Sequence, residues 1–416
     1  MAPLIVVDSK YQFVPPHRGL VWPRLLRPAV LAWLKYRQQI SRIDVEGSEQ
    51  IAALRQAGHG VLLTPNHCRM TDALVLQKLS AVLDQPFYTM ASSHLFRGNR
   101  GMAWALRRLG GFSVYREGID KQSIQAAVDI LVRAERPLVI FPEGALSQAN
   151  DHLQPLQEGV SFIARTAAAR VAKDQDNPTA ASRRIYTVPI AIRYLFQGDA
   201  AQTVGDILSG LESRLGWQPA RRKSLVERVT KVGDALLTLQ EIEHLGCPQA
   251  GSLEDRLQSL IDHLLQPLET EWLRATPSGS VIARVKELRR VIVPDMIGDE
   301  LTGGDLTGAE MRRRWEHLRI AEFAQALSLY PARYVASHPT TDRLLETVER
   351  FEEQLTGQIP VHGPRRVILH VGEPLLVEPR RDRSAPSDSL LQSLTESLTG
   401  LLSRSAGHSR LCVTAS

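Results

Sequence analysis

The sequence feature that most constrains the fold is an alternation of short apolar runs with helical stretches between Ile40 and Tyr194. Strands alternating with helices of ten to fifteen residues indicate an α/β sheet covered by helices on its faces. The predicted strands span residues 60–65, 86–91, 111–115, 137–142 and 185–194, and the predicted helices span residues 73–82, 101–109, 122–134 and 159–172.

The character of the chain changes after Phe196, where helical periodicity replaces the strand pattern, and one strand-like run returns at residues 366–376. A lone strand cannot bury both of its faces, so we expect this run to rejoin the first sheet. The helical block is then an insertion. The sequence thus predicts a mixed α/β sheet flanked by helices and interrupted by a large all-helical insertion. The expected units are an N-terminal amphipathic segment (1–39), an α/β domain (40–197), the helical insertion (198–363), the returning strand (364–379), and a linker with a C-terminal helix (380–416).

Composition excludes several classes of protein. With 43% hydrophobic and 23% charged residues, the chain has the composition of a globular protein rather than a disordered one. Its three cysteines are too few for a disulfide framework or a zinc cluster, so we expect no metal site. No run approaches the ~18 uninterrupted apolar residues that a membrane-spanning helix needs. The net charge of +5 does not by itself argue for nucleic-acid binding, and we expect none.

The distribution of charge is more informative than its sum. Residues 198–363 carry 19 basic and 25 acidic residues, which leaves 31 basic and 20 acidic residues elsewhere, a net +11. The segment from Leu20 to Arg37 interleaves leucine and tryptophan with arginine and lysine. Such a segment can lie in a membrane interface or pack against the sheet, and both alternatives stay open.

Candidate catalytic residues follow the predicted strand at residues 60–65, where His67 precedes Asp72 by five positions. Sites of α/β sheets lie at the carboxyl ends of the strands. A carboxylate that holds one nitrogen of an imidazole protonated leaves the other nitrogen free to accept a proton from a hydroxyl. The alternative is that Asp72, with Thr71, caps the following helix.

Three further patterns follow predicted strands. Arg116 comes directly after residues 111–115, where a guanidinium could hold a phosphate. The segment Phe141-Pro142-Glu143-Gly144 ends another strand, with Glu143 expected at the carboxyl edge of the sheet. Pro189 interrupts the last strand, which suits an edge or a substrate-facing break.

These four blocks in this order resemble the glycerolipid acyltransferase family, which includes the glycerol-3-phosphate and 1-acylglycerol-3-phosphate acyltransferases. The resemblance covers about residues 43–194, and it resumes near Gly372-Glu373-Pro374. It implies that residues 40–197 form a catalytic acyltransferase domain, that His67 deprotonates a lipid hydroxyl and that Asp72 orients His67. It further implies that Arg116 contacts the phosphate of the acceptor, and that Phe141, Pro142, Glu143, Gly144 and Pro189 line its binding site.

The sequence departs from the family pattern at two places. The family commonly continues the Phe-Pro-Glu-Gly block with Thr-Arg-Ser, whereas this chain has Ala145-Leu146-Ser147, which makes a phosphate-bearing acceptor less secure. The position two residues after the histidine, often serine, holds Arg69, which either supplies the lost cation or is a surface residue. Cys68 is interpreted as a small-residue filler rather than a nucleophile.

The expected function is transfer of a fatty acyl group from acyl-CoA or acyl-carrier protein to a lysophospholipid hydroxyl in phospholipid synthesis. The thioester is a co-substrate and no other cofactor is expected. We expect the enzyme to be cytoplasmic and peripheral at the inner face of the membrane. The alternatives are acylation of a lipid alcohol without phosphate, a lipid-binding protein without activity, and thioester hydrolysis.

Overall fold

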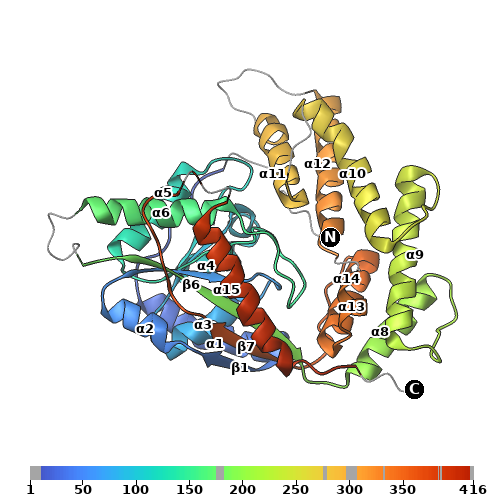
Figure 1. Cartoon of the computed structure of the whole chain (residues 1–416), viewed down its shortest axis with the longest axis horizontal. Coiled ribbons are helices and arrows are strands. Elements are labelled where there is room, and N and C mark those ends of the chain that lie inside the picture. Colours follow the sequence, from blue (N-terminus) through green and yellow to red (C-terminus); the bar gives the residue numbers. More distant parts are fainter. Residues whose placement is uncertain are drawn as a thin grey trace.

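The computed structural model describes residues 11–174, 182–274, 279–296, 307–330, 333–382, 384 and 387–412, and it places a group of helices beside an α/β unit (Figure 1). The α/β unit contains an eight-stranded sheet of order β1-β7-β6-β2-β5-β3-β4, in which β8 pairs with β6. The strands are β1 (Ile40–Glu46), β2 (Gly60–Pro65), β3 (Tyr88–Ser92), β4 (Gly111–Val114), β5 (Leu138–Val139), β6 (Ile185–Phe196), β7 (Arg365–Val371) and β8 (Leu375–Leu376).

Most strand pairs in the sheet are parallel. The exceptions are β7 and β8, which pair antiparallel with β6. They lie on the edge of β6 opposite to β2. The mixed α/β sheet expected from the sequence is therefore confirmed. The strand that follows the long helical segment lies between β1 and β6, so it pairs with strands more than 150 positions earlier in the chain.

The strand predicted at residues 366–376 is in fact two strands, β7 and β8. Between them Gly372 donates its N–H to the carbonyl of Pro189 at 2.8 Å, and Pro374 has no N–H to offer to a ladder. Strand β1 had no counterpart among the predicted strands, because its exposed polar side chains mask the pattern.

Helices cover both faces of the sheet, because alternate residues of the buried strands point to opposite sides. Leu62 packs with the helices α5, α6 and α15, whereas Val61 and Leu63 pack with α1, α2 and α3. Helix α4 packs on β4. The bounds are α1 (Val21–Arg37), α2 (Glu49–Gln56), α3 (Asp72–Val82), α4 (Arg100–Arg108), α5 (Lys121–Arg133), α6 (Glu158–Lys173) and α15 (Ser389–Ser405).

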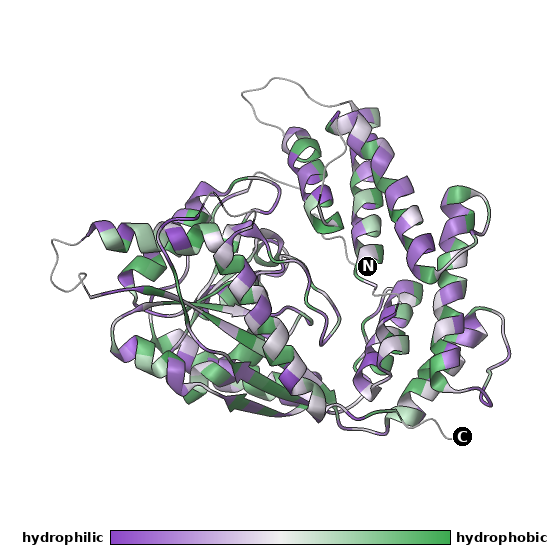
Figure 2. Cartoon of the chain, viewed as in Figure 1, coloured by the Kyte–Doolittle hydropathy of each residue, from purple (hydrophilic) through white to green (hydrophobic). Residues whose placement is uncertain are grey.

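The helices between β6 and β7 form two cores. One core joins α10, α11 and α12, and the other joins α8, α9 and α14 with Phe196 at the end of β6. In Figure 2, green hydrophobic residues alternate with purple hydrophilic ones along these helices, as amphipathic packing requires. The bounds are α8 (Ala200–Arg214), α9 (Leu225–Leu245), α10 (Leu253–Trp272), α11 (Val281–Ile292), α12 (Gly308–Ser328), α13 (Tyr334–Ser337) and α14 (Thr341–Thr356).

Helix α1 packs against the sheet on one face and exposes apolar side chains on the other. Leu34 is fully buried in the core beneath α1, while Val21, Leu25 and Tyr36 are exposed at 72%, 63% and 74%. Within the described ranges, no helix has the length and apolar character to cross a bilayer.

Candidate active site

The loop that carries His67 leaves the carboxyl end of β2, a strand whose residues are all buried. Asn66 continues the pairing of β2 with β6 beyond the last strand residue. Its amide side chain accepts the N–H of Ile192 at 2.6 Å and donates to the carbonyl of the same residue at 3.2 Å. The side chain therefore substitutes for a strand residue and fixes where the loop begins.

His67 and Asp72 are hydrogen-bonded, with 2.9 Å between Nδ1 and Oδ2. The Asp72 carboxylate is fully buried, and it also accepts the N–H groups of Cys68 and Arg69 at 2.8 and 2.9 Å. Its other oxygen accepts the hydroxyl of Tyr194 at 2.7 Å. A carboxylate only accepts, so Nδ1 of His67 carries the proton and Nε2 is left as the basic nitrogen.

Asp72 does not cap the helix that begins at its own position. The N-cap of α3 is Thr71, and no side-chain hydrogen bond caps this helix. The carboxylate instead binds amides of the loop before the helix, together with the imidazole. Its contacts therefore support the orienting role over the capping alternative.

Glu143 holds the backbone of the histidine loop from the opposite side. Oε1 accepts the N–H of His67 at 2.6 Å, and Oε2 accepts the N–H of Gln154 at 2.8 Å. Burial raises the pKa of this carboxyl to about 8, although both backbone hydrogen bonds oppose the shift. Both oxygens are occupied, so Glu143 positions His67 through its main chain.

The rest of the Phe141–Gly144 segment also surrounds His67. The ring of Phe141 stacks on the imidazole with 4.1 Å between centroids. The carbonyl of Pro142 accepts the N–H of Gln157, and the carbonyl of His67 accepts the N–H of Ser147, each at 2.8 Å. The segment therefore fixes both the ring and the backbone of His67.

Arg116 reaches the same segment from the end of β4, because its guanidinium donates to the carbonyl of Gly144. Burial and the nearby cation Arg289 lower the pKa of Arg116 to about 10. Arg289 belongs to α11 and forms an ion pair with Glu117 at 2.6 Å. The insertion therefore adds a second guanidinium beside Arg116.

Pro189 does not belong to an edge strand, so the first of its two expected settings was wrong, while its place in a substrate site stays a prediction. Strand β6 lies inside the sheet, with β2 on one side and β7 and β8 on the other. Pro189 falls where the antiparallel partner of β6 changes from β8 to β7, so its missing N–H interrupts no ladder there. Its side chain is buried against Gly372.

Helix α14 of the insertion holds the loops around His67. Arg69 is bound by Glu349 at 3.0 Å, and its guanidinium lies 5.4 Å from the ring centroid of Tyr194. Glu346 accepts the N–H of Asn150 at 3.1 Å, and Glu353 accepts the side chain of Gln148 at 2.7 Å. Arg69 is thus neither a free surface residue nor an available cation.

Sequence reasoning missed the residues that support the candidate pair, of which only Tyr194 bonds it directly, to Asp72, while the others hold the surrounding loops and Arg116. These are Asn66, Asn150, Tyr194, Arg289, Glu346 and Glu349. The carboxylates of α14 did carry a signal, because their spacing of three or four residues places them on one helix face next to the returning strand.

Cys68 is buried beside this network, and burial with the charge of Asp72 raises the pKa of its thiol well above the usual value. A thiol in this state is a poor nucleophile. Within the described ranges, no group of three His, Cys, Asp or Glu side chains is placed to hold a metal ion.

Comparison with known proteins links this geometry to a family. Residues 42–193 match the family model described as Acyltransferase. Over 91 residues the chain is 30% identical to a 1-acyl-sn-glycerol-3-phosphate acyltransferase of Streptococcus pneumoniae. This similarity covers 22% of the chain and 32% of that relative, so the chain spans about a third of the relative's length. The residues matched by the family model include His67, Asp72, Arg116 and Glu143, whereas Tyr194 and the insertion lie outside that match.

Proposed function

Through residues 42–193 the chain belongs to the glycerolipid acyltransferase family, and from this premise we propose that it moves a fatty acyl group from a thioester to the hydroxyl of a lysophospholipid. The observation that carries the proposal is the His67–Asp72 hydrogen bond, held by a fully buried carboxylate at the carboxyl end of β2. The donor is acyl-CoA or acyl-carrier protein, and no further cofactor takes part.

In the proposed reaction, Nε2 of His67 removes the proton of the acceptor hydroxyl. The hydroxyl oxygen attacks the carbonyl carbon of the thioester, a C–O bond forms and the C–S bond breaks. The proton then passes from His67 to the leaving thiolate sulfur. Asp72 keeps Nδ1 protonated and stabilises the imidazolium, and such general-base help is worth about 10²–10⁴ in rate. No acyl-enzyme is needed, in keeping with the raised pKa of the Cys68 thiol.

The acceptor that fits best carries a phosphate, because Arg116 bonds the carbonyl of Gly144 and Arg289 lies near Arg116. Nε of the buried Arg289 has no hydrogen-bond partner among the described residues. Arg289 is paired with Glu117, so in this proposal it contributes a further guanidinium beside Arg116 rather than a free replacement for the cation missing from Ala145-Leu146-Ser147. Two guanidinium groups suit a phosphate monoester such as that of 1-acylglycerol-3-phosphate.

The protein would meet this acceptor at the inner face of the membrane, from the cytoplasm. The exposed apolar side chains of α1 are accompanied on α4 by Met102 and Trp104, which are 55% and 43% exposed. Trp104 contacts Trp22 of α1 at 5.0 Å, so the two helices present one continuous surface. Arg108 lies over both rings and adds positive charge for anionic lipid.

The test is a product assay with the purified chain, both thioester donors, and acceptors with and without a phosphate. We expect mass spectrometry to detect acylated 1-acylglycerol-3-phosphate, and Arg116→Met to lose this product selectively. Equal acylation of a phosphate-free lipid alcohol by both proteins would favour that alternative acceptor. Release of free fatty acid without any acylated lipid would show thioester hydrolysis instead.

A further inference from the structure

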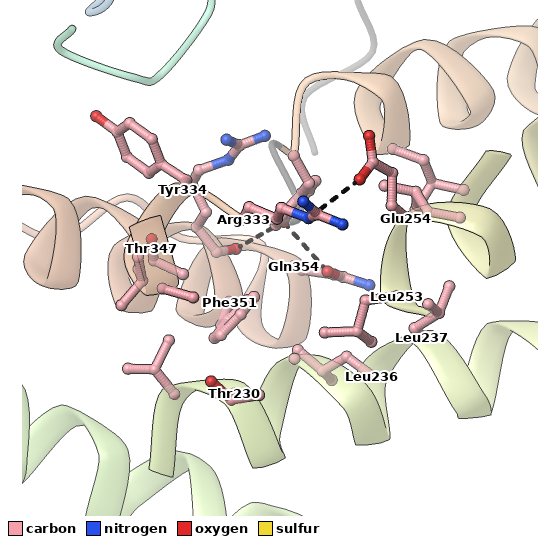
Figure 3. Close-up of a pocket in the computed structure, with 18 of the residues that line it drawn as sticks. Thr230, Leu236, Leu237, Leu253, Glu254, Arg333, Tyr334, Thr347, Phe351 and Gln354 are labelled. Atoms are coloured by element: carbon pink, nitrogen blue, oxygen red, sulfur yellow. Dashed lines mark hydrogen bonds and ion pairs between the residues drawn. The ribbon is translucent and has the colours of Figure 1, made fainter. Parts of the chain in front are cut away.

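A cavity of about 310 Å³ lies inside the insertion, between α9, α10 and the segment from α12 to α14 (Figure 3). Its wall is mainly aliphatic and aromatic, and Figure 3 shows Leu236 and Leu237 on one helix facing Phe351 on another. At its rim an exposed ion pair joins Arg333 to Glu254 at 3.3 Å. An apolar cavity with a few polar groups is the usual form of a small-molecule site, and this volume lies at the lower end of their range.

The exceptional group in this wall is Arg350, which is only 6% exposed. Its guanidinium lies 3.8 Å from the ring centroid of Tyr330, and Nε has no hydrogen-bond partner within the described part of the chain. Among the described residues, no carboxylate forms an ion pair with it. Burial accordingly lowers the pKa of Arg350.

The other buried arginines of the insertion differ from Arg350 in this respect, because each is paired with a carboxylate. The pairs are Arg228 with Glu212, Arg256 with Glu241, Arg284 with Glu269, Arg289 with Glu117 and Arg314 with Glu310. A buried charge without a partner is costly, so a position that keeps one is suited to an anionic ligand.

The carboxylates one turn away on the same helix do not supply that partner. Glu346 accepts the hydroxyl of Tyr334 at 2.9 Å and the N–H of Asn150. Burial also raises the pKa of Glu346 to about 8, which favours its neutral form. Glu353 is bound to Gln148. Neither carboxylate therefore forms an ion pair with Arg350 among the described residues.

We propose that this cavity binds a free fatty acid, with the carboxylate on Arg350 and the alkyl chain against the leucines of α9 and α10. An apolar cavity of ~150 Å³ accepts the six carbons of benzene, so by proportion this one takes a chain of about 12 carbons. The site lies in the insertion and is separate from His67, so it goes beyond the proposed acyl transfer. It does contact the loops around His67 indirectly, because Tyr334 of its wall bonds Glu346.

The experiment is calorimetric titration of the purified full chain with decanoate and, separately, with decan-1-ol, both below their micellar concentrations. We expect both to bind, because the apolar wall accepts either chain. Arg350→Met should weaken decanoate binding about 10- to 100-fold, the value of a hydrogen bond to a charged group, and leave decanol binding unchanged. Thr230→Trp, at an exposed position that lines the cavity, should abolish binding of both.

Arg350→Met removes an unpaired buried charge, so its thermal unfolding should show a folded protein at least as stable as the wild type. The proposal is overturned if the wild type does not bind decanoate, or if Arg350→Met binds it as tightly. It is equally overturned if Thr230→Trp keeps both ligands. If Thr230→Trp weakened the binding of a lysophospholipid and left the binding of decanoate unchanged, the cavity would hold the tail of a substrate, contrary to the proposal.

Discussion

Two sets of arginines in this molecule form ion pairs with carboxylates, one set within the insertion and the other across its boundary with the α/β domain. Arg256 and Arg284 bind Glu241 and Glu269 at 2.8 and 2.7 Å, and all four residues lie on helices of the insertion. Arg69 instead binds Glu349 at 3.0 Å across the boundary between the α/β domain and the insertion. Arg289 crosses the same boundary to Glu117.

The difference indicates that the insertion has two functions. The internal pairs hold its helices together and touch none of the candidate catalytic residues. The crossing pairs end on Arg69, two positions from His67, and on Glu117, next to Arg116. If the candidate site is the active site, part of the insertion supports it, and removing an internal or a crossing pair should have different consequences.

The largest effect on stability is expected for an internal pair. Arg256→Met leaves the fully buried Glu241 without its cation, and removing one partner of a buried pair costs about 3–5 kcal/mol. Denaturant unfolding should show this loss, while the KM of the protein that remains folded stays unchanged. If Arg256→Met kept the stability of the wild type and raised KM, this internal pair would act on the candidate site rather than on the stability of the insertion.

The crossing pair of Arg289 should act on substrate binding. Arg289→Met should raise the KM for a phosphate-bearing acceptor about tenfold or more, since a hydrogen bond to a charged group is lost. Its exposed neighbour Arg290, with a side chain 56% accessible, provides the matched control in Arg290→Met. An equal KM for the two variants would show that Arg289 does not take part in binding the acceptor.

The crossing pair of Arg69 should have a smaller effect, on turnover. Glu349→Gln weakens the contact with Arg69 in the loop after His67 and also the ion pair with the buried Arg365. In a variant that unfolding curves show to be folded, we expect kcat to fall about threefold, or ~0.5–1 kcal/mol. Glu352→Gln is the control, because Glu352 lies on the same helix but pairs with His362. Equal kcat values for the two variants would show that α14 does not position this loop.

A pH dependence of stability is also expected at the same boundary. Burial raises the pKa of Glu346 from 4.5 to about 8 in the folded protein. The folded state holds the proton more tightly, so this contribution to stability is complete below about 4.5 and is lost as the pH rises through 8. Between these limits the wild type should lose stability relative to Glu346→Gln. If the free energies of unfolding of the two proteins changed equally with pH, Glu346 would not be protonated in the folded state as this account requires.

Much of the sheet could be predicted because strand signals are local. The buried strands β2 and β6 appear as continuous apolar runs, and the return of one such run after the helices indicated an interrupted sheet. The division into β7 and β8 could not be predicted in the same way. It depends on the hydrogen bond from Gly372 to Pro189, a partner far away in the sequence.

In the candidate site, too, contacts between residues close in sequence could be predicted and contacts between distant residues could not. His67 and Asp72 are five positions apart in one loop, so their contact follows from the sequence itself. Tyr194 bonds Asp72 from 122 positions away and Glu349 bonds Arg69 from 280, and only the folded chain brings these groups together. Arg289 was equally hidden, because a cation on a helix normally faces solvent.

The central claim is that His67, oriented by Asp72, is the base of an acyl transfer, and the rate of product formation by His67→Ala tests it most directly. The measurement compares purified wild type and variant with acyl-CoA or acyl-carrier protein and 1-acylglycerol-3-phosphate, after unfolding curves establish that both are folded. We expect the rate to fall about 10²–10⁴-fold. A variant that keeps the full rate would contradict this mechanism.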